Sequence, residues 1–351
     1  METTDLLQTL SDAFGPPGFE DDVRATLRTI VEPLVDDVRV DALGNLIATR
    51  HGRSDHTLML DAHMDEIGLM VSYVEESGFL RFATLGGWDA RVIPSHGVTI
   101  KTDDGERIHG VVGTPPPHIL SAKDRKKPFE VEELFIDVGA TSREEAEAMG
   151  IHTGSPVVIH YPFRRMHGPF VTGKALDDRA GCAVLVKVLQ ALRDEELEVN
   201  LVANFAVFEE VGLRGARAAA FSIAPDVALA LEGTVAADVP GIEDARIPTR
   251  LGEGPALTVA DRSLIASPRL LRFIQDVAGD DGIPCQLKTP PSGSTDAAAI
   301  QQSRGGVLAG VISVPCRYIH SPFSILNLDD LENAARLTSA FSKRAHELLQ
   351  A

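Results

Sequence analysis

The chain has 351 residues, of which 44% are hydrophobic and 24% charged, a composition typical of folded globular proteins. Its formal net charge of −18 argues against nucleic acid as a partner, because phosphate binding needs a concentrated basic surface. No apolar run approaches the roughly 18 residues of a membrane span, and no basic segment followed by an apolar stretch opens the sequence. We therefore expect a cytoplasmic protein that binds neither nucleic acid nor a membrane.

The first 60 residues predict two helices followed by strands. Apolar residues recur at intervals of three and four in segments 4–14 and 21–35, which is typical of helices with one buried face. Short apolar or alternating segments separated by turn residues then predict strands at 38–40, 46–50 and 57–61.

The pattern changes between residues 68 and 166, where short alternating strands are separated by Gly and Pro. A capping-box pattern that begins at Ser142 predicts a short helix up to Gly150, followed by a strand at 156–161. We interpret residues 69–166 as a β-rich domain inserted into the first unit.

Strands and helices alternate after Gly173. We expect helices at 180–192, 215–221, 267–278 and 329–349, and strands at 197–208, 227–231 and 306–311. Such alternation predicts a parallel or mixed sheet with helices on both faces. The predicted fold class is therefore α/β, with a three-layer α/β/α domain formed by residues 1–68 and 167–351 and a barrel-like β-rich insert.

Side chains of the kinds that bind metals follow several apolar runs. In open sheets of this type, ligands gather beyond the carboxyl ends of the strands. The residues placed in this way are His63 with Asp65, Glu209 with Glu210, Glu232 and His320, while Asp177 follows a short polar turn and precedes an apolar helical run. Taken singly, each has a plainer structural explanation, such as a helix cap, a solvated strand end or a buried histidine. Their joint occurrence favours a metal centre.

Each of these residues can be given a role in such a centre. We interpret Asp177 as a carboxylate that bridges two metal ions, and Asp178 as a residue that caps the helix or supports the turn. Asp65 follows His63 closely enough to orient its imidazole. Adjacent residues on an extended chain point in different directions, so one residue of the Glu209-Glu210 pair can bind metal while the other serves as a general base.

The donor set also indicates the metals and the reaction. Carboxylates and imidazoles without thiolates suit Zn²⁺ or Co²⁺, and Mn²⁺ less well. Two such ions can bind a substrate carbonyl and activate a water molecule, which is the chemistry of hydrolysis.

These motifs resemble those of the tetrahedral aminopeptidases, a family of dinuclear zinc or cobalt metallopeptidases that includes glutamyl and leucyl aminopeptidases. The resemblance spans nearly the whole chain and is carried by residues 61–68, 173–182, 209–216, 294–297 and 317–321. It implies one metal held by His63, Asp177 and Glu232, and a second held by Asp177, Glu210 and His320. It also implies Glu209 as the general base and Asp65 as the partner of His63. The family commonly has Asp where this chain has Glu232.

The resemblance further implies short peptides as substrates and an α/β/α catalytic domain with an inserted dimerisation domain. It implies self-association into dimers and from these into tetrahedral dodecamers. A basic segment, residues 123–127, would lie in a loop that either lines a neighbour's site or is plain surface. The substrate's side chain could be selected by residues near Gly254, by residues 291–297 or by a neighbouring subunit.

We weigh three alternative functions against an aminopeptidase. A related dinuclear hydrolase, acting as an N-acyl amino acid deacylase or a carboxypeptidase, would use the same metals and base. A metal-stabilised assembly or regulatory subunit without catalysis is disfavoured, because the chain keeps both base and ligands. A glycosidase is disfavoured because carboxylates engaged with metals cannot easily serve as the acid and nucleophile of glycoside cleavage.

Overall fold

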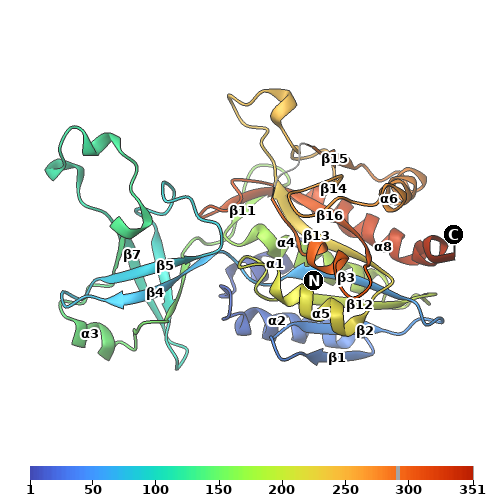
Figure 1. Ribbon diagram of the computed structural model, residues 1–351, viewed down its shortest axis with the longest axis horizontal. Helices are drawn as coiled ribbons and strands as arrows, with labels where there is room; N and C mark the ends of the chain where they lie inside the picture. Colours follow the sequence, from blue (N-terminus) through green and yellow to red (C-terminus); the bar gives the residue numbers. More distant parts are fainter. Residues whose placement is uncertain (290–292, 351) are drawn as a thin grey trace.

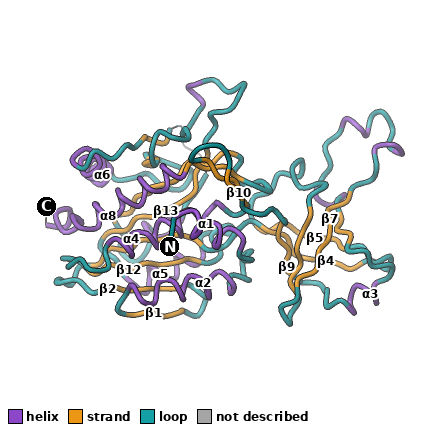
Figure 2. Tube along the Cα trace, turned by 180° about the vertical axis from the view of Figure 1, so that it is seen from behind, coloured by secondary structure: helices purple, strands orange, loops and turns teal. Residues whose placement is uncertain are grey.

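The computed structural model describes residues 1–289 and 293–350, and its chain forms two bodies that lie side by side. One is a large sheet covered by helices, and the other is a smaller β-barrel (Figure 1). The view from behind shows the same separation, with β4, β5 and β7 well away from the helices of the larger body (Figure 2). Among the described residues, no helix combines the length and the apolar character that crossing a membrane requires.

Eleven strands of the described chain form one mixed sheet. Its main path runs in the order β1 (Asp37–Val40), β2 (Leu46–Arg50), β12 (Asn200–Ala206), β3 (Thr57–His63), β13 (Val227–Val235), β16 (Leu308–Arg317), β17 (Ser324–Asn327), β11 (Phe170–Gly173) and β10 (Arg164–Arg165). Beyond β16 lie β14 (Ala256–Thr258) and then β15 (Gln286–Lys288). The central strands β12, β3, β13 and β16 run parallel, so their carboxyl ends reach the same edge of the sheet.

Helices cover both faces of this sheet. One face carries α1 (Thr3–Asp12), α2 (Asp21–Val31), α4 (Leu176–Ala191), α6 (Pro268–Asp280) and α8 (Leu328–Gln350). The other carries α5 (Arg214–Ile223) and α7 (Asp296–Gln301). The helical spacing of Leu6, Leu7 and Leu10 in α1 turns all three side chains into the core, where they are fully buried. The predicted three-layer α/β/α architecture is confirmed.

The smaller body is a closed barrel. Its strands follow one another in the order β4 (Gly68–Val74), β5 (Leu80–Leu85), β8 (Phe135–Asp137), β7 (Arg107–Gly113), β6 (Gly97–Lys101) and β9 (Pro156–Ile159). Alternate apolar side chains such as Leu69, Val71 and Ile100 fill a core of its own. Ser142 caps the predicted short helix, α3 (Arg143–Ala148), by accepting a hydrogen bond from the amide of Glu145. The barrel-like insert is confirmed, and its boundaries at 69 and 166 stay a prediction.

A long arm leaves the barrel between β7 and β8 and projects away from it (Figure 1). It contains the short 3-10 helices η2 (Pro117–Ile119), η3 (Asp124–Lys126) and η4 (Val131–Glu133). The basic segment 123–127 lies in this arm, and all five of its residues are exposed.

Several predicted element bounds were wrong. The second helix ends at Val31 and continues only as the 3-10 turn η1 (Glu32–Leu34), because Pro33 has no amide hydrogen to donate. The strand predicted at 197–208 is limited to β12. The element α4 starts at Leu176, but Asp177 and Asp178 have non-helical backbone angles, so the regular helix begins close to the predicted residue 180. The short elements β11, β14, β15, β17 and α7 were not anticipated, because three to six residues carry too little periodicity to be recognised.

Candidate metal centre

The parallel strands bring the predicted ligands to one edge of the sheet. His63 is the last residue of β3, and Glu209 and Glu210 lie just beyond β12. Glu232 is not beyond a strand end as predicted: β13 continues to Val235, and the Glu232 side chain reaches the centre from within the strand. His320 follows β16 in a loop where its φ is 56°, a left-handed conformation that non-glycine residues seldom adopt outside functional loops.

Asp177 lies between the two histidines. Its Oδ1 is 3.3 Å from Nε2 of His63, and its Oδ2 is 3.3 Å from Nε2 of His320. Two ligands on one tetrahedral zinc ion, each about 2.0–2.1 Å from the metal, are separated by about 3.3 Å. The spacing on each side of Asp177 is therefore that of two donors facing a common ion, as a bridging carboxylate requires.

The remaining ligands complete two groups around this carboxylate. On one side, Oε2 of Glu232 lies 3.7 Å from Nε2 of His63. On the other side, Oε2 of Glu210 lies 3.6 Å from Nε2 of His320. All five predicted metal ligands thus converge, as His63, Asp177, Glu210, Glu232 and His320.

Asp178 also lies close to this centre, joined to Asp177 by a cis peptide bond. One of its oxygens can be grouped with donor atoms of His63 and Glu232 within 4.8 Å. Both oxygens are already engaged, however: Oδ1 accepts a 2.9 Å hydrogen bond from the amide of Gly181, and Oδ2 accepts one of 3.2 Å from the amide of His63. These bonds hold the start of α4 against the end of β3, in agreement with a capping role.

Asp65 makes contacts that the sequence did not predict. Nδ1 of His63 lies 3.1 Å from the main-chain oxygen of Asp65 but 3.5 Å from its carboxylate, so the main chain is the nearer acceptor of the ring N–H. This leaves Nε2 of His63 free to bind metal. The Asp65 carboxylate instead accepts hydrogen bonds from the amides of Glu209, at 3.0 Å, and Glu210, at 3.1 Å.

The insert also reaches the centre. Nδ1 of His320 lies 3.0 Å from the main-chain oxygen of Gly87, which belongs to the loop between barrel strands β5 and β6. The other ring nitrogen, Nε2, faces Asp177. No sequence motif indicated Gly87, because a main-chain carbonyl can be supplied by any residue.

Burial governs the ionisation of the carboxylates. Burial, opposed by the histidines and reinforced by neighbouring acids, raises the pKa of Glu209 and of Glu210 to about 8. Burial also opposes the ionisation of Asp177, but hydrogen bonds with His320 and His63 outweigh it and lower the pKa of that carboxyl.

The donors present fit divalent cations. Imidazole nitrogens and carboxylate oxygens suit Zn²⁺ or Co²⁺, and a cation would compensate buried like charges that are otherwise costly. Oε1 of Glu210 is buried and has no hydrogen-bond partner among the described residues, which leaves it available as a ligand.

The centre opens into a cavity of about 820 Å³. Besides the ligands, this cavity is lined by Thr234, Arg262, Lys288 and residues 293–295. Lys288 is buried, and burial lowers the pKa of its amino group against the effect of the nearby acids. The sequence did not indicate Lys288 or Arg262, because a single basic residue in a short strand or loop carries no pattern.

Of the two segments predicted to select the substrate's side chain, one contributes to the cavity and the other does not. Residues 293–295 of the segment 291–297 line the cavity, whereas residues 291 and 292 lie outside the described residues. Gly254 is not among the described residues that line it; its amide is bound instead by Asp330.

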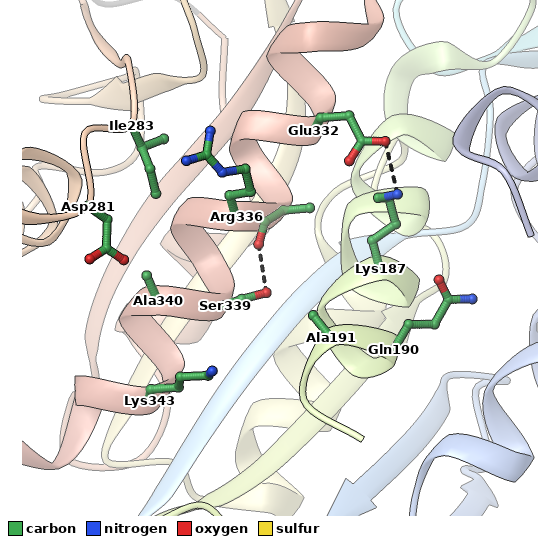
Figure 3. Close-up of a pocket in the computed structure, with 11 residues that line it drawn as sticks. Lys187, Gln190, Ala191, Asp281, Ile283, Glu332, Arg336, Ser339, Ala340 and Lys343 are labelled. Atoms are coloured by element: carbon green, nitrogen blue, oxygen red, sulfur yellow. Dashed lines mark hydrogen bonds and ion pairs between the residues drawn. The ribbon is translucent and has the colours of Figure 1, made fainter. Parts of the chain in front are cut away.

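Another hollow of about 700 Å³ lies between α4, α8 and the segment after α6, and holds none of the candidate ligands (Figure 3). There Nζ of Lys187 pairs with Oε1 of Glu332 at 2.9 Å, and Ser339 donates a hydrogen bond to its own helix. Because none of the candidate ligands lines this hollow, we do not assign it to the metal centre.

Known proteins share this architecture. A family model described as M42 glutamyl aminopeptidase matches residues 44–337. A lysyl aminopeptidase of Pyrococcus furiosus is 35% identical over 339 residues, which cover 96% of this chain and 95% of the relative.

Two solved structures extend the comparison. A TET aminopeptidase from a marine-sediment Thaumarchaeota archaeon superposes with a TM-score of 0.96 at 41% identity, covering 99% of this chain and 98% of the other. The TET1 peptidase of Pyrococcus horikoshii, described as assembling into a tetrahedron or a large octahedral shell, gives a TM-score of 0.88 at 33% identity and covers 97% of this chain and 99% of the other.

Proposed function

We propose that this chain, which belongs to the M42 glutamyl aminopeptidase family, is a dinuclear metallo-aminopeptidase that releases N-terminal residues from short peptides. The family itself makes the chain a peptide hydrolase. The observation that carries the finer assignment is Asp177, whose two oxygens face His63 and His320 at equal distances of 3.3 Å.

The residues would hold two divalent cations, zinc or cobalt, with manganese a further candidate. His63, Asp177 and Glu232 form one set of ligands, and Asp177, Glu210 and His320 form the other. When bound, such cations polarise the scissile carbonyl and make the attacking water more acidic.

Glu209 is the proposed general base. Its Oε2 lies 3.8 Å from Nε2 of His63, its side chain lines the cavity, and its amide donates a hydrogen bond to Asp65. From this position the carboxylate takes a proton from the attacking water and returns it to the nitrogen of the departing amine. Asp65 fixes the backbone from which both glutamates project.

The rival deacylase or carboxypeptidase has one observation in its favour. Lys288 and Arg262 line the cavity, and either cation could hold a carboxylate of the substrate. An aminopeptidase needs the free α-amine of its substrate, whereas the rival activities need an acyl group or a free α-carboxylate.

Matched peptides separate these activities. The chelated protein, reconstituted in turn with zinc, cobalt or manganese, is assayed on free tripeptides and on their N-acetylated and C-terminally amidated forms. We expect metal-restored hydrolysis that N-acetylation abolishes and amidation spares. Cleavage of the acetylated peptides, or a requirement for the free carboxylate, would establish the rival instead.

We also propose that the chain self-associates through its insert, bounded by residues 69 and 166, into dimers and from these into a tetrahedral dodecamer. The assembly described for the Pyrococcus horikoshii TET1 peptidase supports this proposal. The exposed arm with its basic segment 123–127 is available to reach a neighbouring subunit. Native mass spectrometry would detect the dodecamer, and a monomer at all concentrations would refute it.

A further inference from the structure

A groove of about 700 Å³ adjoins the metal centre on the His320 side. One wall is the loop between barrel strands β5 and β6, and the other is the loop between β16 and β17. Gly87, Ile319 and His320 line both the groove and the cavity of the metal centre, so the two spaces adjoin.

Most of the exposed lining of this groove is apolar, and its charged residues Asp89 and Arg91 are bonded to each other. The lining includes Trp88, Val92, Pro94, Tyr318, Pro322 and Phe323. Tyr318 is 48% exposed, so its side chain is accessible to a ligand. Exposed apolar surface in a concave site is typical of places that receive an apolar ligand group.

The aromatic side chains are held in place. Nε1 of Trp88 donates a 2.9 Å hydrogen bond to the main-chain oxygen of Gly68. The Phe323 ring stacks on Tyr161 with centroids 4.9 Å apart, and Tyr318 meets Phe323 edge-on at 6.1 Å. The φ of Tyr318 is 62°, so this loop adopts a left-handed conformation at both Tyr318 and His320. A platform already in place loses little entropy when a ligand binds.

The other side of the centre has a different character. The cavity of the metal centre is lined by Lys288, Arg262 and Thr295, which are polar or charged and do not line the groove. A substrate that spans the centre therefore meets polar groups on one side and an apolar groove on the other. An aminopeptidase accommodates a single residue before the scissile bond, and the rest of the peptide must leave by an open path.

We infer that the groove binds the peptide on the carboxyl side of the scissile bond and selects a large apolar side chain at the second position, with Tyr318 and Trp88 as the specificity-determining contacts. This inference rests on the proposed aminopeptidase function. The occupant is a peptide substrate, because the groove shares Gly87, Ile319 and His320 with the cavity of the metal centre.

The test compares dipeptide amides that share one N-terminal residue. That residue is chosen as the one most rapidly released from a simple amino-acid amide, and the second residue is Gly, Ala, Leu or Phe. Burying a large apolar side chain gives roughly a tenfold gain or more in kcat/KM. We expect kcat/KM for Phe at the second position to exceed that for Gly by at least about tenfold.

The variant Tyr318→Ala should reduce this Phe-to-Gly ratio several-fold. A ratio is the appropriate readout, because general damage to the neighbouring His320 would lower both rates alike. Tyr73→Ala is the matched control: Tyr73 is 50% exposed but lies on β4 of the barrel, and its substitution should leave the ratio unchanged.

The outcomes are distinguishable. If neither the amino-acid amides nor the dipeptide amides are hydrolysed, the proposed function itself fails. If they are hydrolysed with a Phe-to-Gly ratio near one, or if Tyr318→Ala leaves the ratio intact, the groove assignment is overturned. An unchanged ratio together with a smaller assembly of Tyr318→Ala would assign the groove to a contact between copies of the chain.

Discussion

The amide of Glu209 donates a 3.0 Å hydrogen bond to Oδ1 of Asp65, two residues beyond the end of β3. The second oxygen of the same carboxylate binds the next amide, that of Glu210. Asp65 therefore joins the end of β3 to the segment after β12, and positions the proposed base and a proposed ligand together.

Replacing Asp65 by Asn tests this connection. The amide side chain has only one oxygen, so its NH₂ group would face one of the two backbone donors. We expect kcat to fall by about tenfold or more, because replacing a residue that supports metal ligands commonly lowers activity by this much. Metal content by mass spectrometry should be largely retained. Asp37→Asn, at an exposed position of β1, is the control, and a normal kcat in the Asp65 variant would contradict the positioning role.

Glu20 provides a pH prediction outside the ligand set. Burial raises the pKa of its carboxyl from 4.5 to about 7, with a further contribution from Asp65, against hydrogen bonds from the amides of Gly18 and Phe208. The folded state thus holds this proton more tightly than the unfolded state, so the contribution of Glu20 to stability is present below about pH 4.5 and is lost as the pH rises through 7.

The Glu20→Gln variant should not show this loss. Oε1 of Glu20 accepts both amide hydrogen bonds, and the oxygen of Gln can do the same without a charge. Its free energy of unfolding, relative to the wild type, should rise with pH between 4.5 and 7 by up to about 3 kcal/mol. Denaturant titrations at a series of pH values measure this difference. The control is Glu32→Gln, at an exposed position near the end of α2, whose free energy of unfolding relative to the wild type should hardly change with pH. The prediction is refuted if the difference between Glu20→Gln and the wild type does not change with pH.

Some parts of the fold and of the site could be predicted from the sequence, and others could not. Apolar periodicity found the central strands and the long helices, because burial on one face imposes that spacing. It also led to the predicted ligands, with Asp177 before a helix and the others after strands, although Glu232 proved to lie within β13. It could not show that the ring N–H of His63 faces a main-chain oxygen, or that Gly87 of the barrel meets His320. Such contacts depend on the three-dimensional fold and on atoms that every residue possesses.

Glu232→Asp tests the length of the carboxylate at a position where the family commonly has Asp. Oε1 of Glu232 accepts a 3.1 Å hydrogen bond from the amide of Asp296, while Oε2 faces His63. A side chain one methylene shorter cannot maintain both contacts in an unchanged backbone. We expect about tenfold weaker binding of one metal ion, measured by chelator competition. If the variant binds both metal ions as tightly as the wild type does, the backbone must adjust to the shorter side chain.

Metal removal should lower thermal stability. Ions that bind only the folded state stabilise it by about 3 kcal/mol at a hundredfold excess over Kd. Calorimetry should therefore show a higher Tm on adding zinc or cobalt to the chelated protein, and Glu210→Gln should reduce the increase. Glu196→Gln, which alters an exposed ion pair, should not. A Tm independent of metal would argue against ligation by these residues.

The most direct measurement is the metal content and kcat of Glu209→Gln. The variant keeps the size of the side chain and all the proposed ligands, and removes only the proton acceptor. We predict two metal ions per chain, as in the wild type, with kcat on amino-acid amides reduced at least about a hundredfold. The neighbouring variant Glu210→Gln should lose metal instead. Unchanged hydrolysis by the metal-loaded Glu209→Gln protein would contradict the central claim that Glu209 is the general base.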